Sequence, residues 1–239
     1  MRRRLLTLLA VVALGAGTVQ QAGAALDKKD RKVLNRAPEV LTALTGAPDD
    51  RIPDELMERA ECVLVFPDVT KAAFVVGGKY GRGVASCRSA PGSPLGAPAF
   101  FKVGGGSVGW QIGGNQTDLV LLVMNDTGMR HLLKDKFSLG GEVTAAAGPV
   151  GRTAQAATDI TLRAQILSWS RSRGLFVGAS LEGASIFADK DANARLYGAG
   201  VLPRDILLEG QRPIPDAARP FVNLARKLTS SQPTVARKG

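Results

Sequence analysis

The sequence contains only one histidine in 239 residues, together with two cysteines, two tryptophans and two tyrosines. Histidine is the usual base of Ser-His-Asp triads and a common zinc ligand, so both kinds of site would depend on His131. Two cysteines are too few for a disulfide scaffold, and the glycines follow no collagen-like period. A hydrophobic content of 45% argues against disorder. The composition leans away from an enzyme and predicts one domain or a tight pair.

Two glycine-rich motifs match known functional patterns, but the sequence after them does not match. Residues 104–109 fit the G-x-G-x-x-G dinucleotide fingerprint, and residues 105–109 fit a nucleophile elbow at Ser107. Both motifs require a helix directly after the turn, whereas residues 110–114 are typical of strand and turn. We therefore expect no catalytic residue, no cofactor and no metal.

The N-terminus has the pattern of a secretory signal peptide over residues 1–24. Arg2, Arg3 and Arg4 precede an apolar run, and Ala22-Gly23-Ala24 forms a small-residue cleavage site. The apolar run is too short for a transmembrane helix. We expect an exported protein, periplasmic or secreted, whose net charge of +10 falls by three on cleavage.

Export changes the interpretation of Cys62 and Cys87, because an oxidising compartment permits a disulfide between them. Closing such a loop would contribute about 3–4 kcal/mol in the chain-entropy model. The alternative is two reduced, buried thiols on separate strands, and the sequence leaves both open.

Residues 25–60 are predicted to be helical. Apolar residues recur at helical spacing from Leu26 to Leu44, Gly46-Ala47-Pro48 breaks the run, and a second helix is expected from about Pro53. The apolar stripe can pack on the rest of the protein, as such stripes usually do.

Residues 62–189 are predicted to form a β-rich core. Pro67 is expected to end the first strand, and residues 72–76 and 84–87 to form a hairpin around Gly77–Gly83. The clearest alternation runs from Ile160 to Ile166. Further strands are expected at 99–103, 108–112, 119–124, 142–147, 175–179 and 184–188. One helix interrupts the series, with Asn125-Asp126-Thr127 as its N-cap and Phe137 on its apolar stripe.

Glycine is concentrated in this region, where 20 of the 28 glycines lie between Gly77 and Gly183. Glycine weakens strands, so its use predicts bulges, sharp coiling or close approach of layers. No long crossover helices are predicted, which favours antiparallel pairing. We therefore predict an α+β fold: a mainly antiparallel, strongly curved, barrel-like sheet with N-terminal helices, one inserted helix and a C-terminal helix. The C-terminal segment is expected over 200–228, followed by a disordered tail at 229–239.

Positive charge is the remaining functional signal. Trp169 lies next to Arg171 and Arg173, a combination that suits phosphate-rich lipid headgroups. Nucleic acid is not expected as a partner, because the protein is exported and has few aromatic residues. A solvated basic face without a ligand is the other interpretation.

In combination, seven segments of the chain resemble the SYLF lipid-binding domain family. The segments are 65–67, 77–83, 109–113, 118–125, 146–152, 168–176 and 180–183. They occur in order, and we expect a single domain of this kind over residues 25–228. The resemblance implies a non-enzymatic lipid-binding module whose eukaryotic members bind phosphoinositides and work at membranes and actin.

The resemblance also suggests which residues contact lipid. In the family, an N-terminal amphipathic helix and basic residues are implicated, and the matching helix here carries Lys28, Lys29, Arg31, Lys32 and Arg36. Lys79 and Arg82 of the glycine-rich segment complete the candidate set with Trp169, Arg171 and Arg173.

A signal peptide and the lack of a partner module set this sequence apart from the eukaryotic members, so neither actin nor phosphoinositides are expected. We expect peripheral binding to anionic phospholipids of the bacterial envelope. The alternative is an envelope interaction protein that binds a protein partner through its glycine-rich sheet.

Overall fold

A computed structural model describes residues 26–46, 51–73, 76–108, 113–150, 163–172, 175–178, 181, 183–209 and 212–230. The predicted signal peptide and most of the predicted tail lie outside these residues. Among the described residues no helix combines the length and apolarity needed to cross a bilayer.

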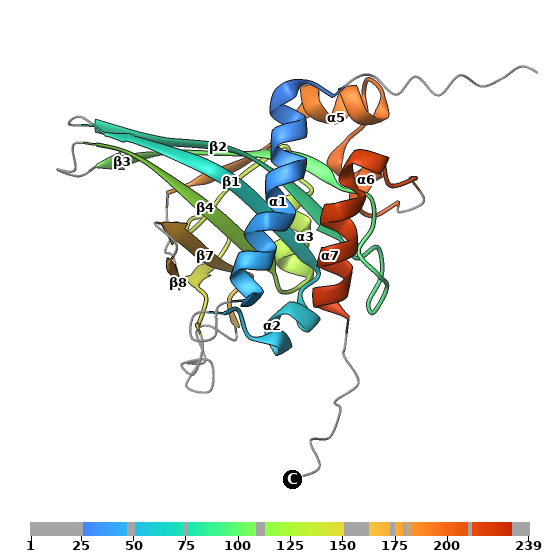
Figure 1. The fold of residues 1–239 in the computed structure, drawn as a ribbon, viewed down its shortest axis with the longest axis horizontal. Coiled ribbons are helices and arrows are strands. Elements are labelled where there is room, and N and C mark those ends of the chain that lie inside the picture. The colour runs from blue at the N-terminus through green and yellow to red at the C-terminus, as the bar shows by residue number, and fades with distance from the viewer. Residues whose placement is uncertain are drawn as a thin grey trace, which may run out of the picture.

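A single sheet of nine strands forms the centre of the described chain (Figure 1). The strands are β1 (Cys62–Ala73), β2 (Val76–Cys87), β3 (Ala99–Val108), β4 (Gly113–Val123), β5 (Lys136–Ser138), β6 (Ala145–Ala147), β7 (Ile166–Ser172), β8 (Leu175–Gly178) and β9 (Ser185–Ala188). Their order is β5-β9-β3-β2-β1-β4-β7-β6, with β8 also paired to β7. Every pairing is antiparallel except that of β6 with β7. The α+β fold with a curved, mainly antiparallel sheet is therefore confirmed.

The helices come from both ends of the chain and from one insertion. They are α1 (Lys28–Gly46), α2 (Asp54–Arg59), α3 (Asp126–Leu132), α5 (Lys190–Tyr197), α6 (Pro203–Leu207) and α7 (Arg219–Thr229), which follows a 3₁₀ turn at Asp216–Ala218. Figure 1 shows α1, α2 and α7 together on one face of the sheet. The long strands β1 to β4 extend beyond them at one end.

The glycine-rich segment is a strand and not a turn, contrary to the prediction. β1 continues through Pro67, and β2 contains all of Gly77–Gly83. β1 passes Pro67 by a bulge, because its register with β2 shifts between Val65 and Thr70. Proline tolerates such a position, since a bulge leaves a residue outside the hydrogen-bonded ladder.

The glycines facing this bulge lie close against β1, the neighbouring strand of the same sheet. A Cβ on Gly83 would lie 2.5 Å from the carbonyl oxygen of Val65 and 2.4 Å from the ring of Phe66. A Cβ on Gly81 would lie 2.7 Å from the side chain of Val69. The predicted use of glycine at bulges is confirmed at these positions, but the close contact is between neighbouring strands of one sheet and not between two layers.

Hydrophobic cores form on both faces of the sheet. On one face the apolar stripe of α1 and residues of α7 cover β-residues such as Val65 and Val120. On the other face Leu64 and Phe101 pack with α3, α6 and β5. Cys62 and Cys87 are opposite each other on β1 and β2, fully buried, and joined by a disulfide, which decides between the two alternatives.

Several boundaries differ from prediction because tertiary context overrides local pattern. Asn125 caps α3 as predicted, but Phe137 lies in β5 and not on the helix. The strand expected from Ile160 begins only at Ile166, and residues 151–162 lie outside the described part. β3 continues to Val108, past the predicted end of its strand at residue 103, and β4 starts at Gly113. Of the strand predicted at 108–112, residues 109–112 lie outside the described part. The helices α5 and α6 were not predicted.

Candidate functional site

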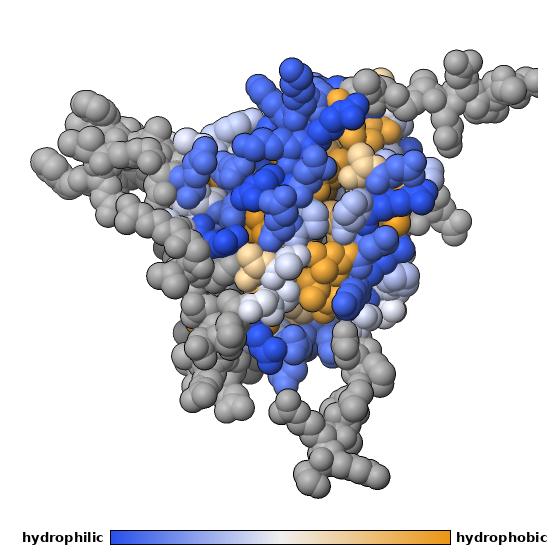
Figure 2. All heavy atoms as spheres, in the orientation of Figure 1, coloured by the Kyte–Doolittle hydropathy of each residue, from blue (hydrophilic) through white to orange (hydrophobic). Residues whose placement is uncertain are grey.

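The exposed face of α1 is cationic, and its apolar face is not available to a ligand. Lys28, Lys29, Arg31 and Lys32 are exposed, whereas the stripe that includes Leu34 is buried against the sheet and α7. Hydrophilic side chains accordingly cover the N-terminal half of α1 in Figure 2. The helix therefore offers charge, and not an apolar stripe, to the solvent.

An ion-pair network fixes the N-terminal end of α1. Asp30 is fully buried, and its carboxylate accepts hydrogen bonds from Arg82 of β2 at 2.6 Å and Arg195 of α5 at 2.9 Å. Asp189, which caps α5, binds the same Arg82 at 2.8 Å and Lys102 of β3 at 3.0 Å. With Asp27, these residues form the Asp30 network, in which three carboxylates balance three cations.

The network also sets the ionisation of its members. Burial raises the pKa of Asp189, but hydrogen bonds from Lys102 and Arg82 lower it by more, so that it lies below its usual value. The backbone N–H of Asp30 is the main cause that lowers the pKa of Asp27. These carboxylates therefore stay charged at neutral pH, which holds α1, β2, β3 and α5 together.

A second charged cluster lies at the β1 bulge. Asp68 has φ 53°, the one left-handed non-glycine residue of the described chain. Its backbone N–H donates to Asp118 of β4 at 3.1 Å, and its carboxylate pairs with Lys32 at 2.8 Å and Arg36 at 3.7 Å. Arg171 of β7 pairs with the same Asp118 at 3.8 Å. The bulge is thus tied to α1 and to the two strands beyond it.

A small cavity of about 210 Å³ lies between these two clusters, where α1 crosses the bulge. We call it the bulge pocket. The polar residues lining it come from α1, β1 and β2: Lys29, Lys32, Asp68, Thr70, Tyr80 and Arg82. Tyr80 is 55% exposed, although it is a large aromatic residue. Lys29 has no acidic partner among the described residues, so the pocket holds an unmatched cation.

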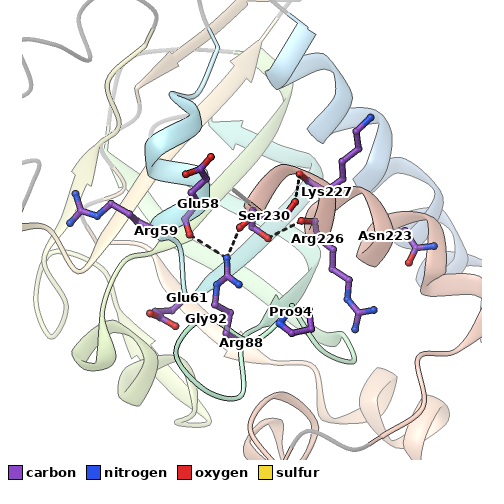
Figure 3. A pocket seen from close by; sticks show the side chains of 11 residues that line it. Glu58, Arg59, Glu61, Arg88, Gly92, Pro94, Asn223, Arg226, Lys227 and Ser230 are labelled. Atoms are coloured by element: carbon purple, nitrogen blue, oxygen red, sulfur yellow. Dashed lines mark hydrogen bonds between the residues drawn. The ribbon is translucent and has the colours of Figure 1, made fainter. Parts of the chain in front are cut away.

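A larger groove of about 760 Å³ is built around Arg88, where the ends of α2 and α7 meet (Figure 3). The Arg88 guanidinium donates to the carbonyls of Glu58, Ala60, Ser93 and Thr229. In Figure 3 the side chains of Arg59, Arg226 and Lys227 point away from this centre. The charge of Arg88 at the centre is thus used to hold the ends of the two helices together, and the role of this groove is structural.

Comparison with known proteins identifies the family. A sequence model of the Ysc84 family, described as "Las17-binding protein actin regulator", matches residues 104–228, just over half of the chain. The chain belongs to the Ysc84 (SYLF) family. The resemblance carried by the seven sequence segments is therefore confirmed.

The Ysc84 relatives cover most of this chain, but they are longer. Yeast Protein YSC84 is 31% identical over 74% of this chain and 38% of its own length. Human SH3 domain-containing YSC84-like protein 1 is 31% identical over 84% of this chain and 58% of its own length. A Schizosaccharomyces pombe SH3 domain-containing protein is 34% identical over 78% of this chain and 44% of its own length. The family description names a binding protein and regulator, and none of these three relatives is named as an enzyme.

Some residues of the family motifs are buried in the core of this Ysc84 member, and others lie at its surface. Trp169 is fully buried and donates its indole N–H to Pro149, and the space of a Cβ on Gly148 is filled by its ring. Trp169 is therefore a core residue and is not placed to contact a membrane. Arg82 belongs to the Asp30 network and only borders the bulge pocket.

The other predicted residues of the set are spread over the molecule. Arg171 lies beside the second cluster, whereas Lys79 contacts Gly105 near β9, on the opposite face from α1. Arg173 lies outside the described residues. The structure brings together Lys29, Lys32 and Arg82 around the bulge pocket, with Arg36 next to them.

Several residues of the site were missed by the sequence analysis. Tyr80, Thr70 and Asp68 line the pocket at the bulge, and no sequence pattern gave the position of that bulge in β1. Asp30 gave a usable signal, since it stands at helical spacing with Val33 and Leu34 on an otherwise apolar stripe. An acid in such a position indicates a buried ion pair.

Proposed function

We propose that this Ysc84-family protein is a non-enzymatic phospholipid-binding protein of the bacterial cell envelope, which docks peripherally on anionic membranes. The observation that carries the proposal is the exposed cationic face of α1. Lys28, Lys29 and Arg31 have no acidic partner among the described residues, and each cation near an anionic surface contributes about 1 kcal/mol. Such binding would be useful and reversible.

The envelope location is part of this proposal. A fully buried disulfide suits an oxidising compartment, and the N-terminal sequence has the pattern of a secretory signal. The family description names a Las17-binding actin regulator, but an exported protein does not meet actin. We therefore propose a lipid surface as the partner and not actin.

Co-sedimentation with vesicles tests the proposal. The protein without residues 1–24 should pellet with phosphatidylglycerol vesicles and not with phosphatidylcholine vesicles, and high salt should release it. The double variant Lys28→Gln/Arg31→Gln should weaken binding roughly 25-fold, since two surface charges are lost. Equal pelleting with both lipids, or none with either, would overturn the proposal.

The second candidate function is that of an envelope interaction protein. The observation in its favour is the free outer edge of two long strands in the described chain, since β9 pairs with β3 only at 101–104 and β7 with β4 only at 118–123. Free edges pair readily with another chain. Cross-linking from this edge that captures one defined protein and no lipid would favour this function.

A further inference from the structure

We infer that the bulge pocket and the exposed ring of Tyr80 form a docking site for a protein segment in which one bulky apolar side chain is flanked by acidic residues. The apolar side chain enters the pocket, and the acidic residues lie against the free cation beside it. The inference does not rest on the lipid binding proposed above. It also differs from pairing at a strand edge, because it uses side chains on the face of the sheet.

The surface of the bulge pocket is mostly apolar, although charged residues surround it. Val33 of α1, Pro67 of the bulge and Gly81 of β2 line it together with Tyr80. Its volume of about 210 Å³ is the share of roughly seven water molecules in the liquid, and it is smaller than a typical pocket for a drug-sized molecule. The pocket therefore has space for one apolar side chain and not for a whole acyl chain.

Tyr80 stands beside this pocket with little to cover its ring. It is 55% exposed and lies opposite Thr70 of β1 and Gly104 of β3. Residues two apart on a strand share a face of the sheet, so Tyr80 is on the same face as Arg82, which binds Asp30 of α1. Residues directly opposite each other also share a face, and Gly104 has no side chain to pack against the ring. One flank of Tyr80 is therefore open to a partner.

The charge around the pocket favours an acidic partner. Lys32 is paired with Asp68 at 2.8 Å, and Arg82 belongs to the Asp30 network, so neither is free for a ligand. Lys29 is exposed, and the described part of the chain offers it no acidic partner. Complementary charge selects partners and suppresses wrong ones, so a carboxylate next to the apolar side chain is expected to meet Lys29.

A protein segment meets this surface more completely than a membrane or a small acid does. A bilayer presents a broad surface, whereas the apolar lining lies in a cavity between α1 and two strands. A small acid would fill the cavity but leave the open flank of Tyr80 uncovered. Tyrosine is enriched at protein interfaces, where anchor side chains fill pockets of the partner. A chain that continues on both sides of its anchor covers the cavity, the ring and Lys29 together.

The two tyrosines of the chain, Tyr80 and Tyr197, give a direct test on the protein without residues 1–24. Labelling with 3-fluorotyrosine yields two fluorine resonances, which the variant Tyr80→Phe assigns. Tyr197 donates its hydroxyl to the carbonyl of Pro98 and does not line the pocket, so it serves as the internal reference. The probe is the blocked peptide Glu-Asp-Phe-Asp-Glu. One control peptide has alanine in place of phenylalanine, and another has lysine in place of the four acids.

We expect the probe to shift the Tyr80 resonance and to leave that of Tyr197 unchanged. The alanine peptide should bind roughly tenfold more weakly, because the buried aromatic side chain is lost. The lysine peptide should show no detectable binding, because its charge has the sign of Lys29. Binding to variants is measured by fluorescence polarisation of a labelled probe.

The variants separate the ring, the free cation and net charge. Tyr80→Ala should weaken binding of the probe roughly tenfold, whereas Tyr80→Phe keeps the ring and should retain binding. Lys29→Gln should weaken it roughly threefold at low salt, as one exposed ion pair would give. Lys227→Gln removes the same charge from the exposed surface of α7 and should leave binding unchanged. Thermal unfolding checks that each variant remains folded.

Four results overturn the inference. They are equal binding of the phenylalanine and alanine peptides, equal weakening by Lys29→Gln and Lys227→Gln, binding of N-acetylphenylalanine as tight as that of the probe, and a Tyr80 resonance that anionic vesicles broaden but no peptide shifts. The third result assigns the pocket to small acids, and the fourth assigns it to a lipid surface and leaves the proposed function standing. If the probe binds as expected and no anionic vesicle does, the inference stands and the proposed function fails.

Discussion

At the scale of single residues, Arg82 decides how much of the positive charge near α1 is available. Its guanidinium forms ion pairs with Asp30 and Asp189, whose side chains are both nearly inaccessible to solvent. Burial lowers the pKa of Arg82, but the hydrogen bond from it to Asp189 and the charges of Asp189 and Asp30 raise it by more. Arg82 is therefore a permanent structural cation, and the exposed lysines of α1 are left to meet a ligand.

The Asp30 network predicts a defined loss of stability in acid. The folded-state pKa of Asp189 is lowered, so its contribution is complete above its unfolded-state pKa of about 3.9 and disappears as the pH falls through the folded-state value. Asp189→Asn keeps an oxygen to cap α5 but leaves Arg82 with one partner fewer, and it should cost about 3 kcal/mol at pH 7. Urea unfolding should show this difference shrinking as the pH falls below the unfolded-state value of about 3.9.

The exposed Asp191 of the same helix provides the control for that measurement. Asp191→Asn should leave the free energy of unfolding within about 0.5 kcal/mol of the unmodified protein, since surface substitutions seldom do more. Parallel pH curves for Asp189→Asn and the unmodified protein would contradict the role assigned to the network.

Glycines show what the sequence can predict at this scale and what it cannot. Their number in the β region predicted bulges, and Gly83, which lies opposite the β1 bulge against Phe66 and Val65, bears this out. Gly106, in the neighbouring strand, has nothing near its missing Cβ. The residue type is the same, but Gly83 lies opposite the bulge of β1, whereas Gly106 lies in β3 opposite Gly78 and away from β1. The difference depends on which strands pair and where the bulge falls, which are properties of paired strands and not of either sequence.

At the scale of elements, α1 was predicted more accurately than the strands. Its period of apolar residues is a local property, and the stripe from Val33 to Leu44 is buried as expected. The sequence could not decide whether that stripe faces a membrane or the sheet, because both are apolar. The prediction of the strands was wrong at Pro67 and at Gly77–Gly83. Proline and glycine suggest turns there, but pairing with the neighbouring strands imposes β-structure.

The buried stripe leads to a prediction about the docked state. Leu34, Leu41 and Leu44 are fully buried, and burial of each contributes about 1.5–3 kcal/mol. Detaching α1 would also break the Asp30 network. The backbone amides of α1 should therefore stay protected from hydrogen exchange when the protein binds phosphatidylglycerol vesicles, as they are in the free protein.

Hydrogen-exchange mass spectrometry of free and vesicle-bound protein makes this measurement. Protein mixed with phosphatidylcholine vesicles serves as the reference for exchange without docking. Faster exchange over residues 33–44 only on anionic vesicles would show that the stripe leaves the sheet and enters the bilayer.

At the scale of the whole molecule, both ends of the described chain meet on one face of the sheet. α1 and α2 precede the strands, α7 follows them, and the three helices share one core. The family model begins only within β3, so the helices α1 and α2 lie outside the matched residues although they cover the same sheet. The cationic face proposed to dock is thus carried by a helix held in place by elements from both ends of the chain.

Arg88 joins these two ends by hydrogen bonds, and its substitution should lower the stability of the whole protein. It donates to Glu58 and Ala60 at the end of α2 and to Thr229 at the end of α7, the last at 2.6 Å. Positive charge at a helix C-terminus is favourable, and each carbonyl left without a donor costs about 1–3 kcal/mol where it is buried. Arg88→Met should therefore lower the free energy of unfolding by about 3 kcal/mol.

Urea unfolding followed both by circular dichroism and by tryptophan fluorescence tests this joint. In a Trp110→Phe background Trp169 is the one remaining tryptophan and reports on the core beneath the helices, whereas circular dichroism reports on the helices and strands together. Because α2 and α7 pack on the same core, the two signals should shift together in Arg88→Met. Arg59→Met, an exposed residue of the same groove, should change the free energy of unfolding by less than about 0.5 kcal/mol. If Arg88→Met behaves like Arg59→Met, or if only the circular dichroism transition moves, the helices are held by the core alone and Arg88 does not join the two ends.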